Sequence, residues 1–551
     1  MSFWSTIAYK IKEVIQKMIG ARTIEQTLHV APTISSQMEE AIQLWTDMYK
    51  NKAPWLREPD WNDPTRIVSL GLPALIASEK ARTALIEFQS EITTPVNEEE
   101  VENPNYVEPQ PDEFGNILPS TTPKTIKLAT PVSSTDRAEY LNDQYTRLKK
   151  KLRTQIEYGI AKGGLVIKPY VIVNEVEGEK GKAQYTIEFD FCQADCFYPL
   201  AFNSSGEITE AAFLETVVQK ELIYRRLEYH KWENNKVTIV NKAYKSTNSA
   251  TEQDLSSVDL GHEIPLSEVP QWKDLQPEVT IADVDKPLFS YFKMPEANTI
   301  DTTSPLGVSG YSRAVDLIKD ADMQYSRLLW EYEGGELAID VDRDALAFTE
   351  QTVDSQGNVR THSTMTQLQR RLYRKIDISN TGETYNPYAP ALRDSSYLQG
   401  LNAILMRIED AVALSRGTLS DAAAEARTAT ELKILKQRSY QANADLQQAI
   451  EEAIKGAIYA ANVYCTLYQI TPEGEYDISF EWDDSIITDV DTELNKRITL
   501  MQNGLASKLE TRMWYFGETE NQAREALAEV QEESQVDMEN QLVMNSNFEK
   551  E

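Results

Sequence analysis

The feature that most constrains the fold is a helical pattern that runs from Thr428 to Ile470 without a proline. Gly456 is the one weak helix former within it. At about 1.5 Å per residue, an unbroken helix of this length would extend about 60 Å. An ordinary globular domain needs no helix that long. The pattern therefore predicts a helix that extends beyond the dimensions of one ordinary globular domain.

Helical and strand-like patterns alternate along the rest of the chain. Apolar spacing predicts helices at 36–50, 73–92, 136–159, 312–333, 393–415 and within 489–551. Alternating patterns predict strands at 165–173, 184–191, 211–220, 221–232, 236–245 and 475–482, with polar loops at 247–305. Two helix starts in the C-terminal segment fit a capping box, Ser507 with Glu510 and Thr519 with Gln522. The chain is therefore predicted to be α+β.

Acidic residues dominate the charge of the chain. It has 551 residues, of which 87 are Asp or Glu and 55 are Lys or Arg, so the formal charge is −32. Such a charge argues against a protein whose whole surface binds nucleic-acid phosphates or anionic membrane. The acidic, proline-containing segment 95–123 is interpreted as an exposed insertion.

Cysteine usage and hydropathy exclude two further classes of protein. Three cysteines in a chain of this length do not form a disulfide scaffold, which favours a reducing compartment. No run of 18 apolar residues exists, so no transmembrane helix is expected. The amphipathic pattern at Met1–Gly20 favours a helix that packs on its own protein or a neighbour over one that lies on a membrane surface.

The common catalytic motifs are missing from the sequence. There is no phosphate-binding loop, no dinucleotide fingerprint and no zinc-protease helix motif, and Gly307–Gly310 is not a nucleophile elbow. The four histidines lie in unrelated segments, and nothing groups one with a nucleophile. No catalytic residue and no cofactor are predicted.

Two short patterns imitate metal sites without completing them. Cys192 and Cys196 lack two further zinc ligands at suitable spacing, so buried thiols are the favoured interpretation. The segment Asp340–Asp344 begins like a calcium loop, but Ala345 replaces the glycine that the loop needs. No metal site is predicted.

Several phrases resemble the portal proteins of tailed bacteriophages, especially the long portals of siphophages that infect Gram-positive bacteria. The most specific phrase is Ser304–Lys319 (SPLGVSGYSRAVDLIK), which is similar to the family's lead into a stem helix. Others are Leu414–Ser420 (LSRGTLS), Arg427–Glu431 (RTATE), Phe480–Ile487 (FEWDDSII) and Phe289–Ile300 (FSYFKMPEANTI). The order and spacing of these phrases carry the resemblance over about residues 130–530.

The resemblance implies an α+β portal fold with named parts. Residues 1–304 would form an α/β wing that contains the insertion 95–123. Residues 305–333 and 393–415 would be two stem helices, with a small α/β clip at 334–392 between them. A tunnel loop at 416–428, a long tunnel-side helix with a returning wing strand at 429–488, and a helical crown at 489–551 would complete the fold.

The resemblance also implies partners and a location in the virion. About twelve copies would form a ring at one capsid vertex, with a channel for double-stranded DNA. Terminase, then a head–tail adaptor, would dock on the clip, and the major capsid and scaffolding proteins would surround the ring. Assembly would take place in the host cytoplasm, without a membrane partner.

Two groups of residues are the candidate sites. Small side chains and mixed charges at the implied tunnel loop suit a surface past which DNA slides, because tight phosphate contacts would hold it. The candidate DNA-facing residues are Arg416, Thr418, Leu419, Ser420, Asp421 and Glu425, and a plain interhelical loop is the alternative. A basic cluster in the implied clip, namely Arg370, Arg371, Arg374 and Lys375, is either a partner contact or a solvated patch.

Two other classes of protein remain as alternatives to a portal. One is a metal-dependent nuclease that uses the region around Asp483 and Asp484. The other is a capsid or scaffold-type shell protein, which would form closed shells or fibres instead of rings.

Overall fold

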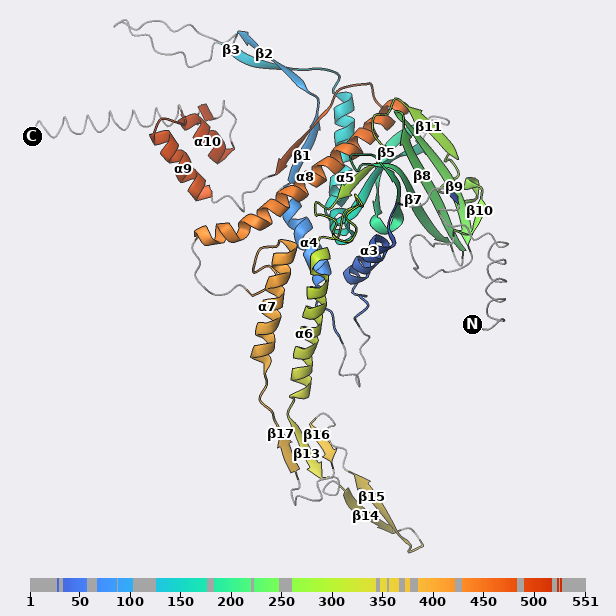
Figure 1. Ribbon diagram of the computed structural model, residues 1–551, viewed down its shortest axis with the longest axis vertical. Helices are drawn as coiled ribbons and strands as arrows, with labels where there is room; N and C mark the ends of the chain where they lie inside the picture. The colour runs from blue at the N-terminus through green and yellow to red at the C-terminus, as the bar shows by residue number, and fades with distance from the viewer. Residues whose placement is uncertain are drawn as a thin grey trace, which may run out of the picture. The chain divides into compact units, whose positions relative to one another are not determined.

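Figure 1 shows the computed structural model of the chain. It describes residues 27–28, 33–56, 67–86, 88–102, 125–175, 183–219, 222–246, 260–342, 347–353, 356–365, 372–376, 385–421, 429–482, 490–517, 523–524 and 526–527. The chain divides into two compact units, residues 1–480 and 481–551, which are taken separately below. Helices and strands both contribute substantially, which confirms the α+β class. The segment Met1–Gly20 lies outside the described residues.

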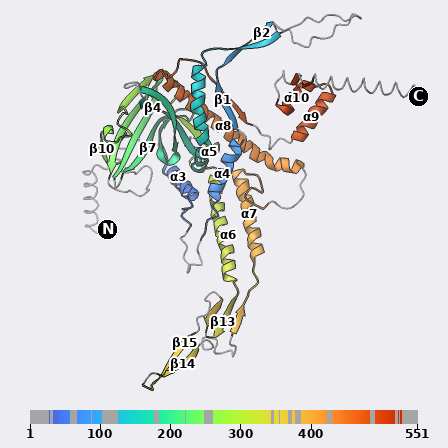
Figure 2. The same ribbon diagram turned by 180° about the vertical axis from the view of Figure 1, so that it is seen from behind.

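The largest sheet of the first unit is antiparallel. Its strands run in the order β10-β9-β8-β7-β6, and a further strand, β11, also pairs with β9. Figure 2 shows this sheet from behind, with β10 at its edge. Asn234 and Asn235 adopt positive φ angles of 53° and 56°, which suits the tight turn between β8 and β9. The bounds are β6 Phe197–Phe202, β7 Ile208–Gln219, β8 Leu222–Glu233, β9 Lys236–Ser246, β10 His262–Ile264 and β11 Glu278–Ala282.

A second, three-stranded sheet carries the helices of the first unit. The order is β12-β4-β5, with bounds β12 Ser290–Lys293, β4 Gly164–Glu175 and β5 Ala183–Gln193. Helix α5 (Asp136–Lys162) packs on β4 and β5, and α8 (Ala429–Leu467) packs on β4 and β12. Two shorter helices, α3 (Ser36–Tyr49) and α4 (Leu72–Leu85), pack against α5.

The long helix predicted from the sequence is confirmed as α8, a single helix of 39 residues. Its one glycine has a packing reason, because a Cβ at Gly456 would collide with the Ser290 side chain of β12. Gly456 therefore allows a close approach of helix and sheet. Buried side chains from Leu446 to Cys465 line the face of α8 that packs on this unit, among them Ile450, Ile454 and Ile458.

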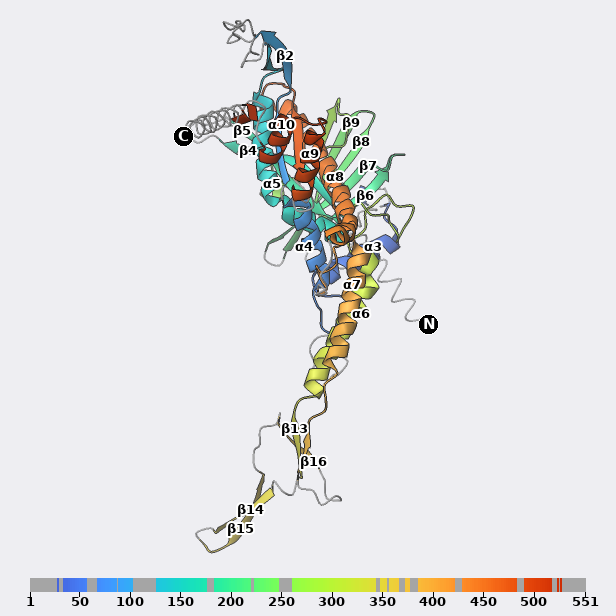
Figure 3. The same ribbon diagram turned by 90° about the vertical axis from the view of Figure 1, so that its left-hand side faces the viewer.

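Two helices lie side by side below this body in Figures 1 and 3. They are α6 (Val315–Gly334), which follows a short 3₁₀ turn at Ser312–Ala314, and α7 (Asp394–Val412). Arg393 and Glu331 form an ion pair at 2.7 Å that ties the end of α6 to the start of α7. The predicted helices at 312–333 and 393–415 are confirmed with ends shifted by a few residues.

Small strands fill the connection between α6 and α7. Strand β13 (Ala338–Asp342) pairs in parallel with β16 (Tyr373–Ile376) and antiparallel with β17 (Tyr385–Tyr388). A separate hairpin joins β14 (Ala347–Val353) and β15 (Val359–Met365). The described elements between α6 and α7 are therefore short strands.

Two predictions near residue 90 are corrected by the structure. The helix predicted at 73–92 ends at Leu85, and Phe88–Thr93 forms strand β1, which pairs with β18 (Asp477–Trp482). Ser90 and Ile92 are buried and alternate with exposed neighbours, as expected for a strand that has one buried face. The segment therefore forms a strand despite its helix-like apolar spacing. The acidic segment begins as strand β2 (Val96–Glu102), which pairs with β3 (Thr125–Pro131), while 103–124 lie outside the described residues.

The segment predicted as loops at 247–305 also needs correction. It contains β10, β11 and β12, and the buried Trp272 packs with Tyr224, Ala243 and Val269 in one cluster of the core. These strands are only three to five residues long, too short to be recognised from their pattern, and they form by pairing with β9 and β4.

The second unit contains α9 (Val490–Gln502) and α10 (Lys508–Phe516) among its described residues. The capping box predicted at Ser507 and Glu510 is confirmed, since each side chain accepts a hydrogen bond from the other residue's backbone N–H. The guanidinium of Arg497 lies 4.4 Å from the ring centre of Trp514 and joins the two helices. Thr519 and Gln522 lie outside the described residues.

A buried cluster of charged side chains joins the six-stranded sheet to the sheet β12-β4-β5. Glu228 on β8 contacts Lys168 at 2.7 Å, Arg226 at 2.9 Å and His230 at 2.7 Å. Burial alone would raise the pKa of Glu228, but the three neighbours hold it well below its ordinary value of 4.5. Burial lowers the pKa of His230 below 6.5, although Glu228 opposes that shift.

We expect the free energy of unfolding to fall as the pH is lowered below about 6.5, because the unfolded chain then protonates His230 while the fold keeps it neutral. The contribution of neutral His230 to the free energy of unfolding is fully present above the pKa of this residue in the unfolded chain. It is lost as the pH falls toward the lower pKa that His230 has in the fold, and the free energy then changes by up to about 1.4 kcal/mol per pH unit. Glu228 adds to this loss only at still lower pH, because its folded pKa lies well below 4.5. Urea unfolding at several pH values measures the slope.

The control for this prediction is the exposed His262 on β10. His230→Gln is expected to flatten the slope between about pH 6.5 and 4.5, whereas His262→Gln keeps it. An unchanged slope in His230→Gln would assign the pH dependence to other groups.

Candidate functional site

The junction that follows α7 is folded back onto the end of that helix. Ala413 takes a left-handed conformation with φ 58°, and the Leu414 N–H donates to the carbonyl oxygen of Glu409 at 2.9 Å. This closes the helix as a C-terminal cap does. The chain then turns through 414–421, and residues 422–428 lie outside the described residues.

The carboxylate of Glu409 holds this turn in place. Its Oε1 accepts hydrogen bonds from the backbone N–H groups of Gly417, Leu419 and Ser420 at 3.1, 2.6 and 2.9 Å, and its Oε2 accepts one from Ser420 Oγ at 2.8 Å. Glu409 is fully buried. A carboxylate in the last turn of a helix is disfavoured by the helix dipole. Four hydrogen bonds to one side chain compensate for that cost, and they fix the start of the loop rigidly to α7.

The structure separates the candidate DNA-facing residues into different environments. Arg416 and Thr418 are exposed, and the Thr418 hydroxyl donates to the Ser415 carbonyl at 2.6 Å. Asp421 is exposed, and its N–H donates to Asn402 Oδ1 at 2.8 Å. Leu419 is half-buried, Ser420 is buried against Glu409, and Glu425 lies outside the described residues. The Ser420 hydroxyl thus has a partner inside the protein and turns away from solvent.

The charge of Arg416 is already matched within the chain. Its guanidinium forms an ion pair with Asp410 at 2.7 Å, with both side chains 44% exposed. The hydrogen bond from Arg416 lowers the pKa of the Asp410 carboxyl below its ordinary value. The described start of the loop therefore offers a surface of mixed, paired charge instead of a cluster of free cations.

The basic cluster expected in the clip is placed only in part. Arg374 and Lys375 lie on β16, opposite Asp340 and Val341 of the parallel neighbour β13. The other two members, Arg370 and Arg371, lie outside the described residues. Whether the four form a contact surface for a partner stays a prediction.

Metal-ligating side chains do not gather anywhere in the described part of the chain in groups of three or more. Cys192 and Cys196 are free, but Cys192 is only half-buried and Cys196 is exposed, so the expectation of two buried thiols was wrong. Desolvation by the surrounding protein still raises the pKa of the two thiols to about 12 and about 11. Asp340 and Asp342 belong to strand β13 instead of a calcium-binding loop. The nuclease candidates Asp483 and Asp484 lie outside the described residues. Within the described ranges, no helix is long and apolar enough to cross a membrane.

Sequence reasoning missed two anchoring side chains. One is Glu409, and the other is Arg137 at the start of α5, which is buried and donates six hydrogen bonds to acceptors in residues 462–472. The available signal for a buried charge was a charged residue next to an apolar residue of the helix. Glu409 follows Ile408, and Arg137 precedes Ala138. Neither position belongs to a motif.

A comparison with known protein families gives a match that covers most of the chain. A family model described as "Phage portal protein, SPP1 Gp6-like" matches residues 40–539. No curated protein matches the chain. The family match covers both units and includes α6, α7, the junction and α8. The chain therefore belongs to the SPP1 Gp6-like family of phage portal proteins.

Proposed function

We propose that about twelve copies of this portal protein form a ring at one capsid vertex, through which double-stranded DNA is packaged and later ejected. Membership of the family supports a ring oligomer that meets DNA, terminase and capsid. The ring would dock terminase during packaging and the head–tail adaptor afterwards. It would assemble in the host cytoplasm among major capsid and scaffolding proteins and remain in the virion.

The helices and strands support a division of the chain into portal parts. We assign 1–304 to the wing, 305–333 and 393–415 to the stem, and 334–392 to the clip. The observation behind the last two assignments is that α6 and α7 lie side by side, while the small strands β13–β17 fill their connection. The tunnel loop is assigned to 416–428, the tunnel-side helix and returning strand to 429–488, and the crown to 489–551.

The observation that carries the proposal of DNA passage is the anchored junction between α7 and α8. A surface that lets a duplex slide should avoid free cations, because release of counterions from phosphates would hold the DNA in place. Arg416 is paired with Asp410, and Asp421 adds a negative charge nearby in the sequence. We infer that Arg416, Thr418, Leu419 and Asp421 face the channel, followed by Glu425, and that Ser420 serves the anchor.

Electron microscopy of the purified protein tests the ring. Discrete rings of about twelve subunits with a central hole are expected. Monomers, closed shells or fibres would contradict the proposal. We further propose that the protein is not an enzyme, and metal-dependent cleavage of DNA that disappears in Asp483→Asn would favour a nuclease instead.

Deletion of Ala422–Glu425 tests the role of the tunnel loop. The deletion keeps every described contact of the anchor, so rings are expected to form in normal yield. Capsids that carry these rings are expected to package or retain less DNA. The measurement is the yield of DNA-filled capsids and the length of the packaged genome. Normal values for both would remove the loop from the mechanism.

A further inference from the structure

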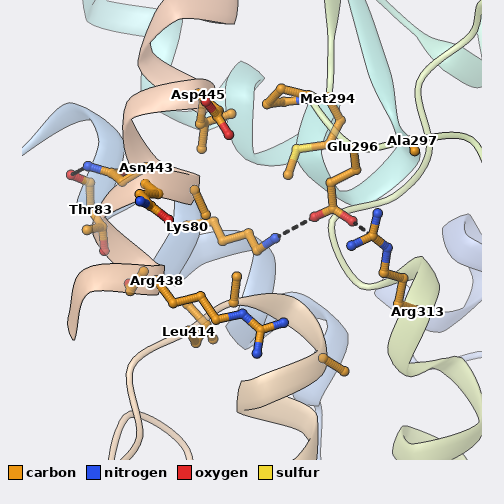
Figure 4. Close-up of a pocket in the computed structure, with 17 residues that line it drawn as sticks. Lys80, Thr83, Met294, Glu296, Ala297, Arg313, Leu414, Arg438, Asn443 and Asp445 are labelled. Atoms are coloured by element: carbon orange, nitrogen blue, oxygen red, sulfur yellow. Dashed lines mark hydrogen bonds and ion pairs between the residues drawn. The ribbon is translucent and has the colours of Figure 1, made fainter. Parts of the chain in front are cut away.

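A cavity of about 290 Å³ lies where the end of α7 and the turn before α6 meet α4 and α8. Figure 4 shows the side chains that line it. They come from α4, from residues 294–297, from the turn before α6, from the end of α7 and from residues 438–446 of α8. The size is that of a small ligand pocket. The cavity adjoins the anchored junction, since Ala413 and Leu414 form part of its wall.

Basic side chains outnumber acidic ones in the wall of this cavity. Lys80, Arg313 and Arg438 carry positive charge, whereas Glu296 and Asp445 carry negative charge. Their formal sum is 3 − 2, or +1. The whole chain has a net charge of −32, whereas the wall of this cavity is positive. The positive wall would favour the binding of a negatively charged group.

Glu296 is already engaged by two of the three cations. Its Oε1 lies 3.0 Å from Lys80 Nζ, and its Oε2 lies 3.7 Å from Arg313 Nε. Burial lowers the pKa of Lys80, and Glu296 opposes that shift. The Glu296 carboxylate is needed to keep the buried Lys80 ammonium charged. It is therefore not available to neutralise the third cation of the wall.

Arg438 is that third cation. Figure 4 shows its guanidinium directed into the cavity, toward the space beside Lys80 and Arg313. Asp410, which does not line the cavity, is close enough for the charge of Arg438 to help lower the pKa of its carboxyl, but that carboxyl is paired with Arg416. Among the residues that the structure describes, no side chain forms an ion pair with Arg438. A guanidinium presents a planar fork of donors that matches a carboxylate with two hydrogen bonds. The wall of the cavity therefore has a donor fork that is in no ion pair, and a net charge of +1.

We propose that an Asp or Glu side chain from a second copy of this chain enters the cavity and pairs with Arg438. The inference rests on the proposed ring, in which every copy meets two others. A copy is a rich source of carboxylates, because acidic residues outnumber basic ones by 87 to 55. One carboxylate neutralises the wall, whereas a phosphate dianion would exceed its charge and would meet Glu296.

Such a contact would couple neighbouring subunits at the base of the tunnel loop. The wall includes Leu414, which follows the helix cap of α7 and precedes the segment held by Glu409. A displacement of the loop in one subunit would then shift the wall of its cavity. The Asp or Glu of the next subunit, bound in that cavity, would move with it.

Site-directed photo-crosslinking in purified rings tests the occupant. A photoreactive amino acid in place of Gln441, an exposed residue in the wall, is expected to give a covalent dimer. Mass spectrometry is expected to identify a partner peptide that contains Asp or Glu. Rings that form but give only crosslinks within one chain would overturn the inference and leave the proposed ring intact. A wild-type protein that forms no rings would overturn both.

Variants of Arg438 give an independent readout. Arg438→Ala is expected to raise the protein concentration for half-assembly about tenfold, and added salt should narrow the difference from wild type. The matched control is Arg82→Ala, since Arg82 is an exposed arginine of α4 that pairs locally with Glu79 and does not line the cavity. Equal assembly of Arg438→Ala and wild type would overturn the inference. So would thermal stabilisation by inorganic phosphate that depends on Arg438 without any crosslink between chains.

Discussion

Replacing Glu409 with alanine is expected to detach the start of the proposed tunnel loop from α7. The backbone N–H groups of Leu419 and Ser420 and the Ser420 hydroxyl would lose their acceptor at once, and the Gly417 N–H would keep only Ser420 Oγ at 3.2 Å. A buried donor without a partner costs about 1–3 kcal/mol, so the turn at 417–420 should leave its place and become solvated. We expect the closed conformation of this turn to lose about 3 kcal/mol in total, while rings still form.

Hydrogen exchange is the direct measurement of this effect. A loss of about 3 kcal/mol corresponds to amide exchange about 100 times faster at 417, 419 and 420. The matched control is Asp410→Asn, which changes the adjacent acid but removes only an exposed ion pair worth about 1 kcal/mol or less. Equal exchange in Glu409→Ala and wild type would show that the carboxylate does not hold the turn.

The functional consequence of Glu409→Ala concerns DNA, not assembly. A detached turn would no longer present Arg416, Thr418 and Asp421 in fixed positions, so capsids built with this variant should contain less DNA. Glu409→Gln keeps an oxygen acceptor of the same length and is expected to fall between wild type and alanine. Rings that fail to form in Glu409→Ala would instead indicate a general role in folding.

Elements with strong periodicity could be predicted from the sequence. Helix α8 has apolar residues at helical spacing along most of its length, and two consecutive glycines mark the end of α6. The end of α7 at Ala413 has no such signal, and the prediction extended that helix to residue 415. Strands β4, β5, β7, β8 and β9 alternate or are continuously apolar, and each is within a few residues of its predicted bounds. In these cases local propensity and the packed environment favour the same structure.

Elements that depend on a distant partner could not be predicted. Residues 88–93 carry a helix-like pattern, but β18 lies almost 390 positions away and pairs with them, and the Ser90 hydroxyl donates to the Ser479 carbonyl at 2.7 Å. Strand β11 has only five residues, most of them exposed, and it forms because it pairs with β9. Tertiary pairing overrides local propensity at both places.

The contacts at the start of the candidate loop could not be predicted from the sequence, and its role toward DNA stays a prediction. The resemblance, through the order of the matching phrases, implied a loop between α7 and α8. The sequence did not show that the Ser420 side chain points inward, because its acceptor, Glu409, lies 11 residues earlier on α7. The cavity was equally hidden, since Lys80, Glu296, Arg313 and Arg438 come from four distant segments.

Replacing Arg137 is expected to cause the largest loss of stability among these variants. Its guanidinium donates to the carbonyl oxygens of Asn462, Thr471 and Pro472 and to side-chain oxygens of Asn462, Thr466 and Thr471, at 2.6–3.2 Å. These contacts tie the C-terminal end of α8 and the chain that follows it to α5. Arg137 is 1% exposed, and all its acceptors are neutral. The six hydrogen bonds therefore carry the whole stabilisation of a buried charge.

Arg137→Leu would leave buried carbonyls without donors, and we expect it to lower the free energy of unfolding by about 3–5 kcal/mol. Arg137→Lys should rescue little, because an ammonium has three donors and lacks the planar fork that satisfies acceptors on both sides. Urea unfolding at a fixed protein concentration measures the loss, and Arg153→Leu on the exposed face of α5 is the control. Stability of Arg137→Lys close to wild type would mean that charge alone, not the fork geometry, secures the end of the long helix.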